Sequence, residues 1–132
     1  MPTFAAIDDR TLLRIVGASA NLMWSANKVI FEKGSVAEAL FIILSGRVRI
    51  LDVVDDEQVE IATLEPGDFF GELALLLHTV HSKTAMAVDD TELMVLPKDS
   101  FQELLASNAE LAGQFRRTLE TRLSVPEAAK LT

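Results

Sequence analysis

The residues best suited to chemistry lie at positions 69–75, which read Phe-Phe-Gly-Glu-Leu-Ala-Leu. Gly71 can adopt backbone angles that other residues resist, and a glycine turn leading into a helix presents several backbone N–H groups to one bound anion. Glu72 would repel a phosphate, but its carboxylate accepts hydrogen bonds from hydroxyl groups. The pair therefore predicts a ligand that carries a phosphate and a hydroxyl close together, such as a ribose phosphate. The alternative is an ordinary turn between a strand and a helix, with an exposed Glu72.

The composition narrows the classes of protein to consider. The 132 residues fit one domain, and 49% hydrophobic with 24% charged residues predict a packed core. The net charge of −8 argues against nucleic acid as a partner, because a nucleic-acid-binding surface normally carries a basic face. The lack of cysteine excludes disulfides and thiolate sites and favours a cytoplasmic location. No apolar run is long enough to span a bilayer and no secretory signal pattern is visible, so we expect no membrane insertion.

Two histidines, His78 and His81, follow the Gly-Glu turn at a spacing of three residues. Such a pair can bind a metal ion, but no third ligand is evident nearby, so we expect no metal site. Glu72 and His81 could also be taken for an acid–base pair. Because no nucleophile arrangement or second carboxylate pair accompanies them, we expect no catalytic residues and no enzyme activity.

The elements that must position this turn are predicted to be mostly short strands. A helix is expected from Asp8 or Asp9 to about Asn21, within an N-terminal helical segment at residues 1–23. Trp24 follows it and is expected in the core. Alternating and buried apolar runs between glycine turns then predict strands at residues 28–32, 39–44, 47–50, 58–62, 83–88 and 91–96. Residues 55–57 form an acidic hairpin tip.

The last third of the chain is predicted to be helical. Asp99 and Gln102 have the spacing of a capping box that opens one helix, and Ser107 and Glu110 have the same spacing at the start of a second. In the second helix, apolar residues repeat every four positions at Leu111, Phe115, Leu119 and Leu123. Strands framed by helices in this order predict a small antiparallel barrel or jelly roll with flanking helices.

The spacing of glycines and apolar residues resembles the cyclic nucleotide-binding domain family. The resemblance covers residues 4–123 and rests on Gly34 and on residues 40–43, 46–48 and 64–75. It implies a mainly β fold: an eight-stranded antiparallel, cupin-like jelly roll with an N-terminal helix and C-terminal lid helices. The expected organisation is one domain over residues 1–132. Its β-roll lies at 28–97, with a short helix at 72–77, and the C-terminal helices lie at 99–124.

The resemblance also implies which residues bind the ligand. In relatives, the glycine and the residues after it offer backbone N–H groups to a cyclic phosphate, and the glutamate accepts a hydrogen bond from the ribose 2′-hydroxyl. The matching residues here are Gly71, Glu72, Leu73 and Ala74, with Phe70 before them. The implied ligand is cAMP or cGMP, with cAMP favoured by its frequency in the family, and no cofactor is expected.

This chain departs from the family where relatives carry a Pro-Arg pair whose arginine binds the phosphate. Val80 stands in place of the proline and His81 in place of the arginine. Arginine is always charged and grips a phosphate with two parallel N–H groups, whereas neutral histidine offers one donor. A hydrogen bond to a charged group is worth ~1.5–3 kcal/mol. Its loss predicts roughly ten- to two-hundred-fold weaker binding.

The residues after His81 could compensate for the missing arginine. Ser82 sits where some relatives place a hydroxyl on the phosphate or the base, and Thr84 sits where relatives often have threonine. Lys83 would share a face of an extended strand with His81. We hypothesise that Lys83 or protonated His81 supplies the missing positive charge. In the alternative, Lys83 is solvated, His81 is a surface residue, and the pocket has drifted.

The final helix carries Arg116, Arg117 and Arg122 beside its apolar stripe. The resemblance implies that this helix closes over the purine and passes the signal onward. Alternatively, the stripe packs on the barrel or pairs two subunits in a homodimer. No output domain is recognisable after the lid, so the signal would go to a protein partner or to an output domain elsewhere. Met1 and Pro2 favour a stand-alone or N-terminal module.

Two functions of different classes follow from the sequence. The first is a non-enzymatic regulatory module that binds a cyclic nucleotide and signals through movement of the lid helix. The second is a degenerate relative that no longer binds nucleotide and docks on a protein partner through the lid helix or the acidic tip. The intact Gly71–Glu72 pair favours the first function, and the missing arginine favours the second.

Overall fold

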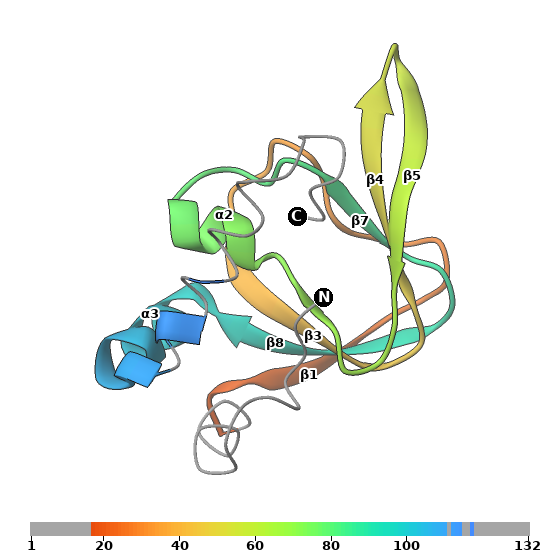
Figure 1. Ribbon diagram of the computed structural model, residues 1–132. Coiled ribbons are helices and arrows are strands. Elements are labelled where there is room, and N and C mark those ends of the chain that lie inside the picture. The colour runs from red at the N-terminus through yellow and green to blue at the C-terminus, as the bar shows by residue number, and fades with distance from the viewer. Residues whose placement is uncertain (1–16, 111, 115–116, 118–132) are drawn as a thin grey trace.

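Eight antiparallel strands form the two sheets of a jelly roll in the computed structural model, which describes residues 17–110, 112–114 and 117 (Figure 1). One sheet has the order β1-β8-β3-β6 and the other β2-β7-β4-β5. The strands of the first sheet are β1 (Ala20–Trp24), β8 (Thr91–Pro97), β3 (Ala39–Ser45) and β6 (Phe69–Phe70). Those of the second are β2 (Val29–Phe31), β7 (Thr84–Ala87), β4 (Val48–Val54) and β5 (Glu57–Leu64). The predicted fold class is confirmed.

The hairpin β4–β5 extends away from the rest of the roll (Figure 1). Its turn places Asp55 and Asp56 at φ angles of 53° and 65°, a left-handed conformation that aspartate tolerates better than most residues. The acidic hairpin tip predicted at residues 55–57 is therefore present.

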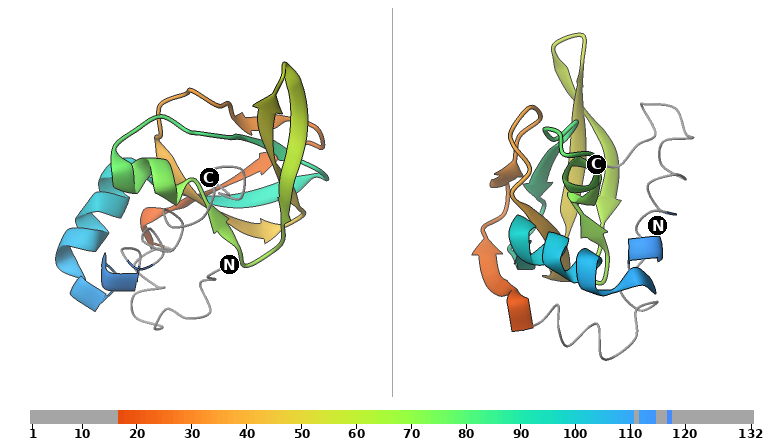
Figure 2. Two further views of the ribbon diagram at one scale, coloured as in Figure 1. Left: turned by 45° about the horizontal axis from the view of Figure 1, so that its top comes forward. Right: turned by 90° about the vertical axis from the view of Figure 1, so that its left-hand side faces the viewer.

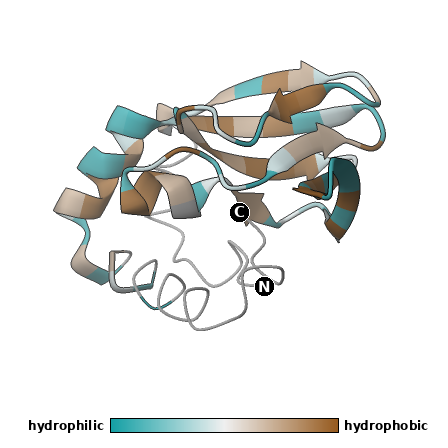
Figure 3. Cartoon of the chain, turned by 90° about the horizontal axis from the view of Figure 1, so that it is seen from above, coloured by the Kyte–Doolittle hydropathy of each residue, from teal (hydrophilic) through white to brown (hydrophobic). Residues whose placement is uncertain are grey.

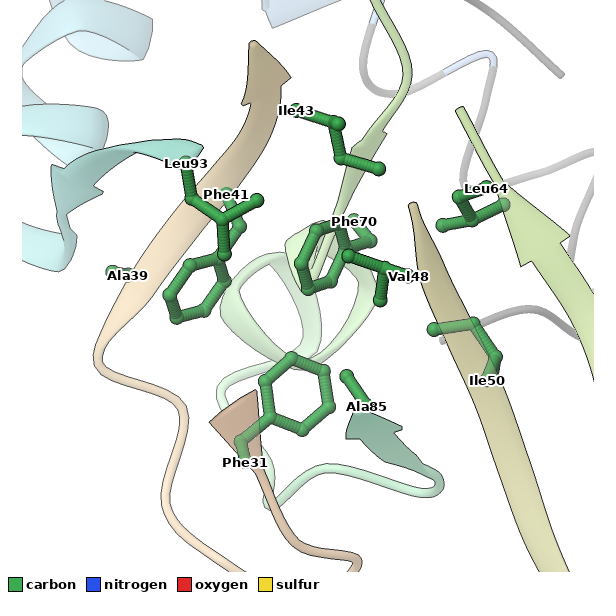
Figure 4. Close-up of a cluster of buried hydrophobic side chains, with 10 residues drawn as sticks. All are labelled: Phe31, Ala39, Phe41, Ile43, Val48, Ile50, Leu64, Phe70, Ala85 and Leu93. Atoms are coloured by element: carbon green, nitrogen blue, oxygen red, sulfur yellow. The ribbon is translucent and has the colours of Figure 1, made fainter. Parts of the chain in front are cut away.

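One hydrophobic cluster lies between the two sheets, with members from both (Figure 4). Three phenylalanines pack at its centre, with ring centroids 5.2 Å apart for Phe41 and Phe70, and 5.7 Å and 5.9 Å from Phe31 to these two rings. Trp24, predicted in the core, is half-buried and meets Phe41 edge-on at 6.3 Å, so it packs at the edge of this core. Figure 3 shows brown, hydrophobic bands interspersed with paler and teal, more hydrophilic ones along the strands.

A second cluster joins the two helices to the first sheet. Helices α2 (Glu72–Leu77) and α3 (Lys98–Ser107) lie on the same side of the roll (Figure 2). Ala74 and Leu75 of α2 and Phe101 of α3 pack here on Leu40 and Leu96 of the sheet. Helix α2 has the bounds that the sequence predicted for it.

The capping box predicted at Asp99 and Gln102 does not form, and Ser107, predicted to open a second helix, is the last residue of α3. Helix α3 begins at Lys98, one residue before Asp99, and its N-cap is Pro97 without a side-chain cap hydrogen bond. The Lys98 N–H instead donates to the Glu38 carbonyl at 2.8 Å, so a distant backbone oxygen satisfies the helix start. The Ser107 hydroxyl donates back to the Leu104 carbonyl at 3.3 Å.

The N-terminal helix does not continue to Asn21 as predicted. Residues 17–18 are helical, but Ala20–Trp24 is strand β1, which pairs with β8. Gly17 and Ser19 are poor helix formers, and β8 offers an open edge to the chain. The rest of that helix and the apolar stripe at Leu111, Phe115, Leu119 and Leu123 lie outside the described residues. None of the described helices has the length and hydrophobicity needed to cross a membrane.

Candidate functional site

The predicted Gly-Glu turn connects the two-residue strand β6 to helix α2. Phe70 pairs with Phe41 of β3 and is completely buried, so its side chain belongs to the core that supports the turn. Gly71 follows with φ 86° and ψ −4°, a left-handed conformation that favours glycine. A Cβ atom at Gly71 would lie 3.2 Å from Cδ2 of Phe41 and 3.3 Å from the Ala39 carbonyl oxygen. The turn therefore depends on glycine for both its angle and its packing.

Glu72 is the first residue of α2 and is only 1% exposed. The alternative of an exposed Glu72 is therefore wrong. A carboxylate in the first turn of a helix is stabilised by the partial positive charge of that helix end. Ala74 is also buried and packs in the cluster beneath the helices, so its predicted role rests on its backbone N–H. The backbone of Leu73 lies in the same first turn.

His81 lies against this turn. A Cβ atom at Gly71 would be 3.7 Å from Cε1 of His81. The imidazole stacks on Phe31, with ring centroids 3.6 Å apart, and is 3% exposed. Two backbone hydrogen bonds fix the residue, from His81 N–H to the Ser35 carbonyl (2.9 Å) and from Gly34 N–H to the His81 carbonyl (2.8 Å). His81 is therefore a buried residue beside the turn, and the alternative that it lies on the surface is wrong.

Burial of the His81 ring lowers its pKa from 6.5 to about 4, because the charged form loses its hydration. The ring is therefore neutral at pH 7. A protonated His81, one of the two charge sources predicted from the sequence, requires a bound anion that raises this pKa again. Nδ1 of His81 and Oγ of Ser82 are both buried without a hydrogen-bond partner in the described part of the chain.

Lys83 is 1% exposed and is not the solvated residue of the alternative interpretation. Its ammonium lies 3.6 Å from Oδ2 of Asp52, which also accepts a 2.9 Å hydrogen bond at Oδ1 from Lys33. Residues 82 and 83 form a bend, and β7 begins only at Thr84, so the predicted strand at 83–88 starts one residue late. The Thr84 hydroxyl accepts a hydrogen bond from the Lys33 backbone N–H at 3.0 Å.

The structure thus places His81, the first residue of the predicted segment 81–84, against the Gly71 turn. Lys83 lies beside Asp52 and Lys33, two residues that the sequence analysis did not include. One signal was available, because Asp52 interrupts an apolar run at residues 50–54. Among the described residues, no three His, Asp or Glu side chains gather closely enough to hold a metal ion.

The structure also contains a hollow of about 180 Å³ beside α2. Its lining is mostly apolar and includes Val36, Ala74, Leu75 and Val80, with His78, Thr79 and Lys98 as its polar residues. Of the predicted site residues it includes Ala74, but not Gly71 or His81.

Comparison with known proteins connects this geometry to a family. Residues 22–108 match the family model of the cyclic nucleotide-binding domain. The chain belongs to this family. It is similar to a cyclic nucleotide-gated potassium channel from Rhizobium etli, with 34% identity over 128 residues, 96% of this chain and 35% of the channel.

Solved structures support the same assignment. The catabolite activator protein of Thermus thermophilus is 28% identical with a TM-score of 0.83, over 91% of this chain and 57% of that one. The EAL enzyme Bd1971 is 27% identical in both its cGMP-bound and cAMP-bound forms, with a TM-score of 0.69, over 79% of this chain and 28% of that one. The cyclic nucleotide-binding domain described here thus spans less than two thirds of each of these relatives.

Proposed function

We propose that this domain is a regulatory module that binds a cyclic nucleotide, with cAMP preferred over cGMP, at the Gly71 turn. The observation that carries the proposal is the buried Glu72 at the start of α2, directly after the left-handed Gly71. The two carboxylate oxygens of Glu72 can accept several hydrogen bonds, and a hydroxyl group of a ligand can donate one of them. A ribose 2′-hydroxyl is such a donor, and the family match supports a ligand of this kind.

The cyclic phosphate would lie against the backbone N–H groups of residues 71–74. His81 and Ser82 would add two side-chain contacts, because Nδ1 and Oγ are buried without partners among the described residues and each can carry a hydrogen that it donates to a phosphate oxygen. Since neutral His81 supplies a dipole and not a full charge, we expect weaker binding than in arginine-containing relatives.

The preference for cAMP rests on its frequency in the family, and Bd1971 has been solved with either nucleotide. Binding would be transmitted through movement of the C-terminal helix to a protein partner or output domain. No catalytic step is assigned to this domain. The proposal also places it in the cytoplasm, which the absence of cysteine supports.

Isothermal titration calorimetry with cAMP and with cGMP tests the proposal. Wild type should bind cAMP, and Glu72→Ala should weaken binding at least tenfold because the 2′-hydroxyl loses its acceptor. The matched control is Glu103→Ala, at an exposed position of α3, which should bind like wild type. Absence of heat with both nucleotides at millimolar concentration would overturn the proposal.

The second candidate function is a protein-interaction module without nucleotide. It is favoured by the neutral His81 in place of a charged residue. A partner recovered equally with and without cAMP, and equally after Glu72→Ala, would support this function over the first.

A further inference from the structure

The polar cluster of Lys33, Asp52 and Lys83 joins three neighbouring parts of the second sheet. The register that pairs Leu51 with Thr84 brings Asp52 of β4 opposite Lys83. Lys33 follows β2, the strand on the other side of β7. The two lysines differ in environment, since the Lys33 side chain is 47% exposed and that of Lys83 is 1% exposed.

Asp52 shares its carboxylate unequally between the two ammonium groups. Oδ1 accepts hydrogen bonds from the Lys33 ammonium at 2.9 Å and from the Val53 backbone N–H at 2.8 Å. Oδ2 lies 3.6 Å from the Lys83 ammonium, which is an ion pair without the short distance of a charge-assisted hydrogen bond. Asp52 would therefore keep two close partners if Lys83 turned away from it.

Lys83 is near enough to the Gly71 turn to meet an anion bound there. His81 touches the turn, and two residues of chain span at most ~7 Å, which limits the backbone separation of His81 and Lys83. The flexible four-carbon stem of lysine lets its ammonium reach more than one partner over such a distance. A phosphate at the turn and the Asp52 carboxylate would thus attract the same ammonium.

We infer that Asp52 sets the anion affinity of this site by competing with the bound phosphate for the Lys83 ammonium. The inference rests on the proposed function. It adds that Asp52, which does not itself contact the ligand, regulates the affinity of the site. In this scheme Lys33 matters as well. The Lys33 ammonium donates a hydrogen bond to Oδ1 of Asp52. This bond weakens the attraction between Asp52 and Lys83 and so raises the affinity for the ligand.

The first test replaces Asp52 by its uncharged isostere and measures cAMP binding by calorimetry. Asp52→Asn should tighten binding at least threefold, because the Asp52 carboxylate no longer competes with the phosphate for the Lys83 ammonium. The matched control is Asp89→Asn, which removes an aspartate from the exposed Arg47 ion pair and should leave binding unchanged within twofold. A merely structural role of Asp52 predicts the opposite sign, since a displaced Lys83 would disturb the site.

The second test uses an exposed residue, so that folding is not at risk. Lys33→Gln should weaken cAMP binding at least twofold more than Lys28→Gln, the control for loss of one exposed positive charge. Both the Asp52→Asn and the Lys33→Gln effects should disappear in a Lys83→Gln background. Thermal unfolding of each variant identifies any that fails to fold. If Asp52→Asn unfolds, the Lys33→Gln comparison decides the inference alone.

The outcomes separate the two proposals. If wild type binds cAMP but Asp52→Asn binds equally or more weakly, or if Lys33→Gln matches its control, the competition is overturned and the nucleotide site stands. If the effects persist without Lys83, the competition is overturned as well. If wild type binds neither cAMP nor cGMP, the proposed function fails, and this inference fails with it.

Discussion

The two ends of the paired strands β4 and β7 differ in how their buried polar side-chain atoms are hydrogen-bonded. At the Thr91 end, formed by Gly46, Arg47, Asp89 and Thr91, the buried Thr91 hydroxyl lies 2.9 Å from the Asp89 carbonyl and 3.1 Å from the Arg47 carbonyl. At the His81 end, formed by Gly71, His81, Ser82 and Lys83, Nδ1 of His81 and Oγ of Ser82 have no partner within the described residues. The buried Thr91 hydroxyl is thus satisfied by its neighbours, whereas the two buried polar atoms at the His81 end are not.

This difference in hydrogen bonding indicates which end contributes to stability and which contributes to binding. A satisfied buried hydroxyl contributes to folding, whereas a buried polar atom without a partner costs about 1–3 kcal/mol. Retaining two such atoms beside the Gly71 turn is consistent with a site that completes its hydrogen bonds through a ligand. Substitutions at the Thr91 end should therefore change mainly the free energy of unfolding. Those at the His81 end should change mainly binding.

The largest expected effect compares the glycines of the two ends. A Cβ at Gly46 (φ 84°) would lie 2.5 Å from Oγ1 of Thr91 and 2.6 Å from the Asp90 carbonyl oxygen. The nearest atom to a Cβ at Gly71 (φ 86°) is 3.2 Å away. Chemical denaturation should show a loss of about 3–5 kcal/mol for Gly46→Ala and about 2 kcal/mol for Gly71→Ala, since both are strained and the first is also overpacked. Only Gly71→Ala should weaken cAMP binding, and equal losses of stability would contradict the packing difference.

The next effect is a pH dependence of stability that comes from His81. Its pKa is about 4 when folded and 6.5 when unfolded, so the unfolded chain binds the extra proton between these values. The stabilisation is complete above pH 6.5 and is lost as the pH falls to about 4. At 1.36 kcal/mol per pKa unit it amounts to about 3 kcal/mol.

Denaturation of wild type and His81→Gln across this pH range measures that contribution as the difference between the two profiles. His78→Gln, at an exposed position, is the control for loss of an imidazole. Parallel profiles for wild type and His81→Gln would show that burial does not hold His81 neutral. In the bound state the phosphate raises the pKa of His81, so cAMP should bind wild type more tightly at pH 5 than at pH 7.

Restoring a permanent charge at the His81 end should sharpen the contrast in binding. His81→Arg should tighten cAMP binding roughly ten- to two-hundred-fold, since a charge-assisted hydrogen bond is worth ~1.5–3 kcal/mol. A guanidinium can also stack on Phe31, as the imidazole does at 3.6 Å. Calorimetry measures the change, and affinity equal to that of wild type would mean that the arginine position no longer faces the ligand.

The smallest expected effect concerns one hydroxyl at each end. Thr91→Val keeps the shape but removes the donor to the Asp89 and Arg47 carbonyls, and should cost about 1–2 kcal/mol of stability. Ser82→Ala removes a hydroxyl without a partner among the described residues and should leave stability within about 0.5 kcal/mol. Ser82→Ala should instead weaken cAMP binding, and Thr91→Val should not. A reversal of either pair of results would break the distinction between the ends.

Local patterns in the sequence were enough to predict most of the roll. Alternation and buried apolar runs identified the strands around β3, β4, β5 and β8, because a strand with one wet face repeats every two residues. The glycine followed by a glutamate and an apolar run predicted the turn at Gly71, and the family resemblance implied the bounds of α2. β1 was missed, because its pairing with the edge of β8 overrode the local preference of residues 20–24. The short β6 was not predicted either, and it pairs with β3 through Phe69 and Phe70 only.

The sequence by itself thus determined the strand pattern, the glycine turn and the chemistry available at Glu72 and His81. Only the tertiary structure decided that burial lowers the pKa of His81 to about 4, that Asp52 pairs with Lys83, and that the Glu38 carbonyl caps α3. The physical reason is distance along the chain. Desolvation of a ring by Phe31, fifty residues away in sequence, and an ion pair across two strands depend on which segments the fold brings into contact. A pattern of neighbouring residues in the sequence does not predict such a contact.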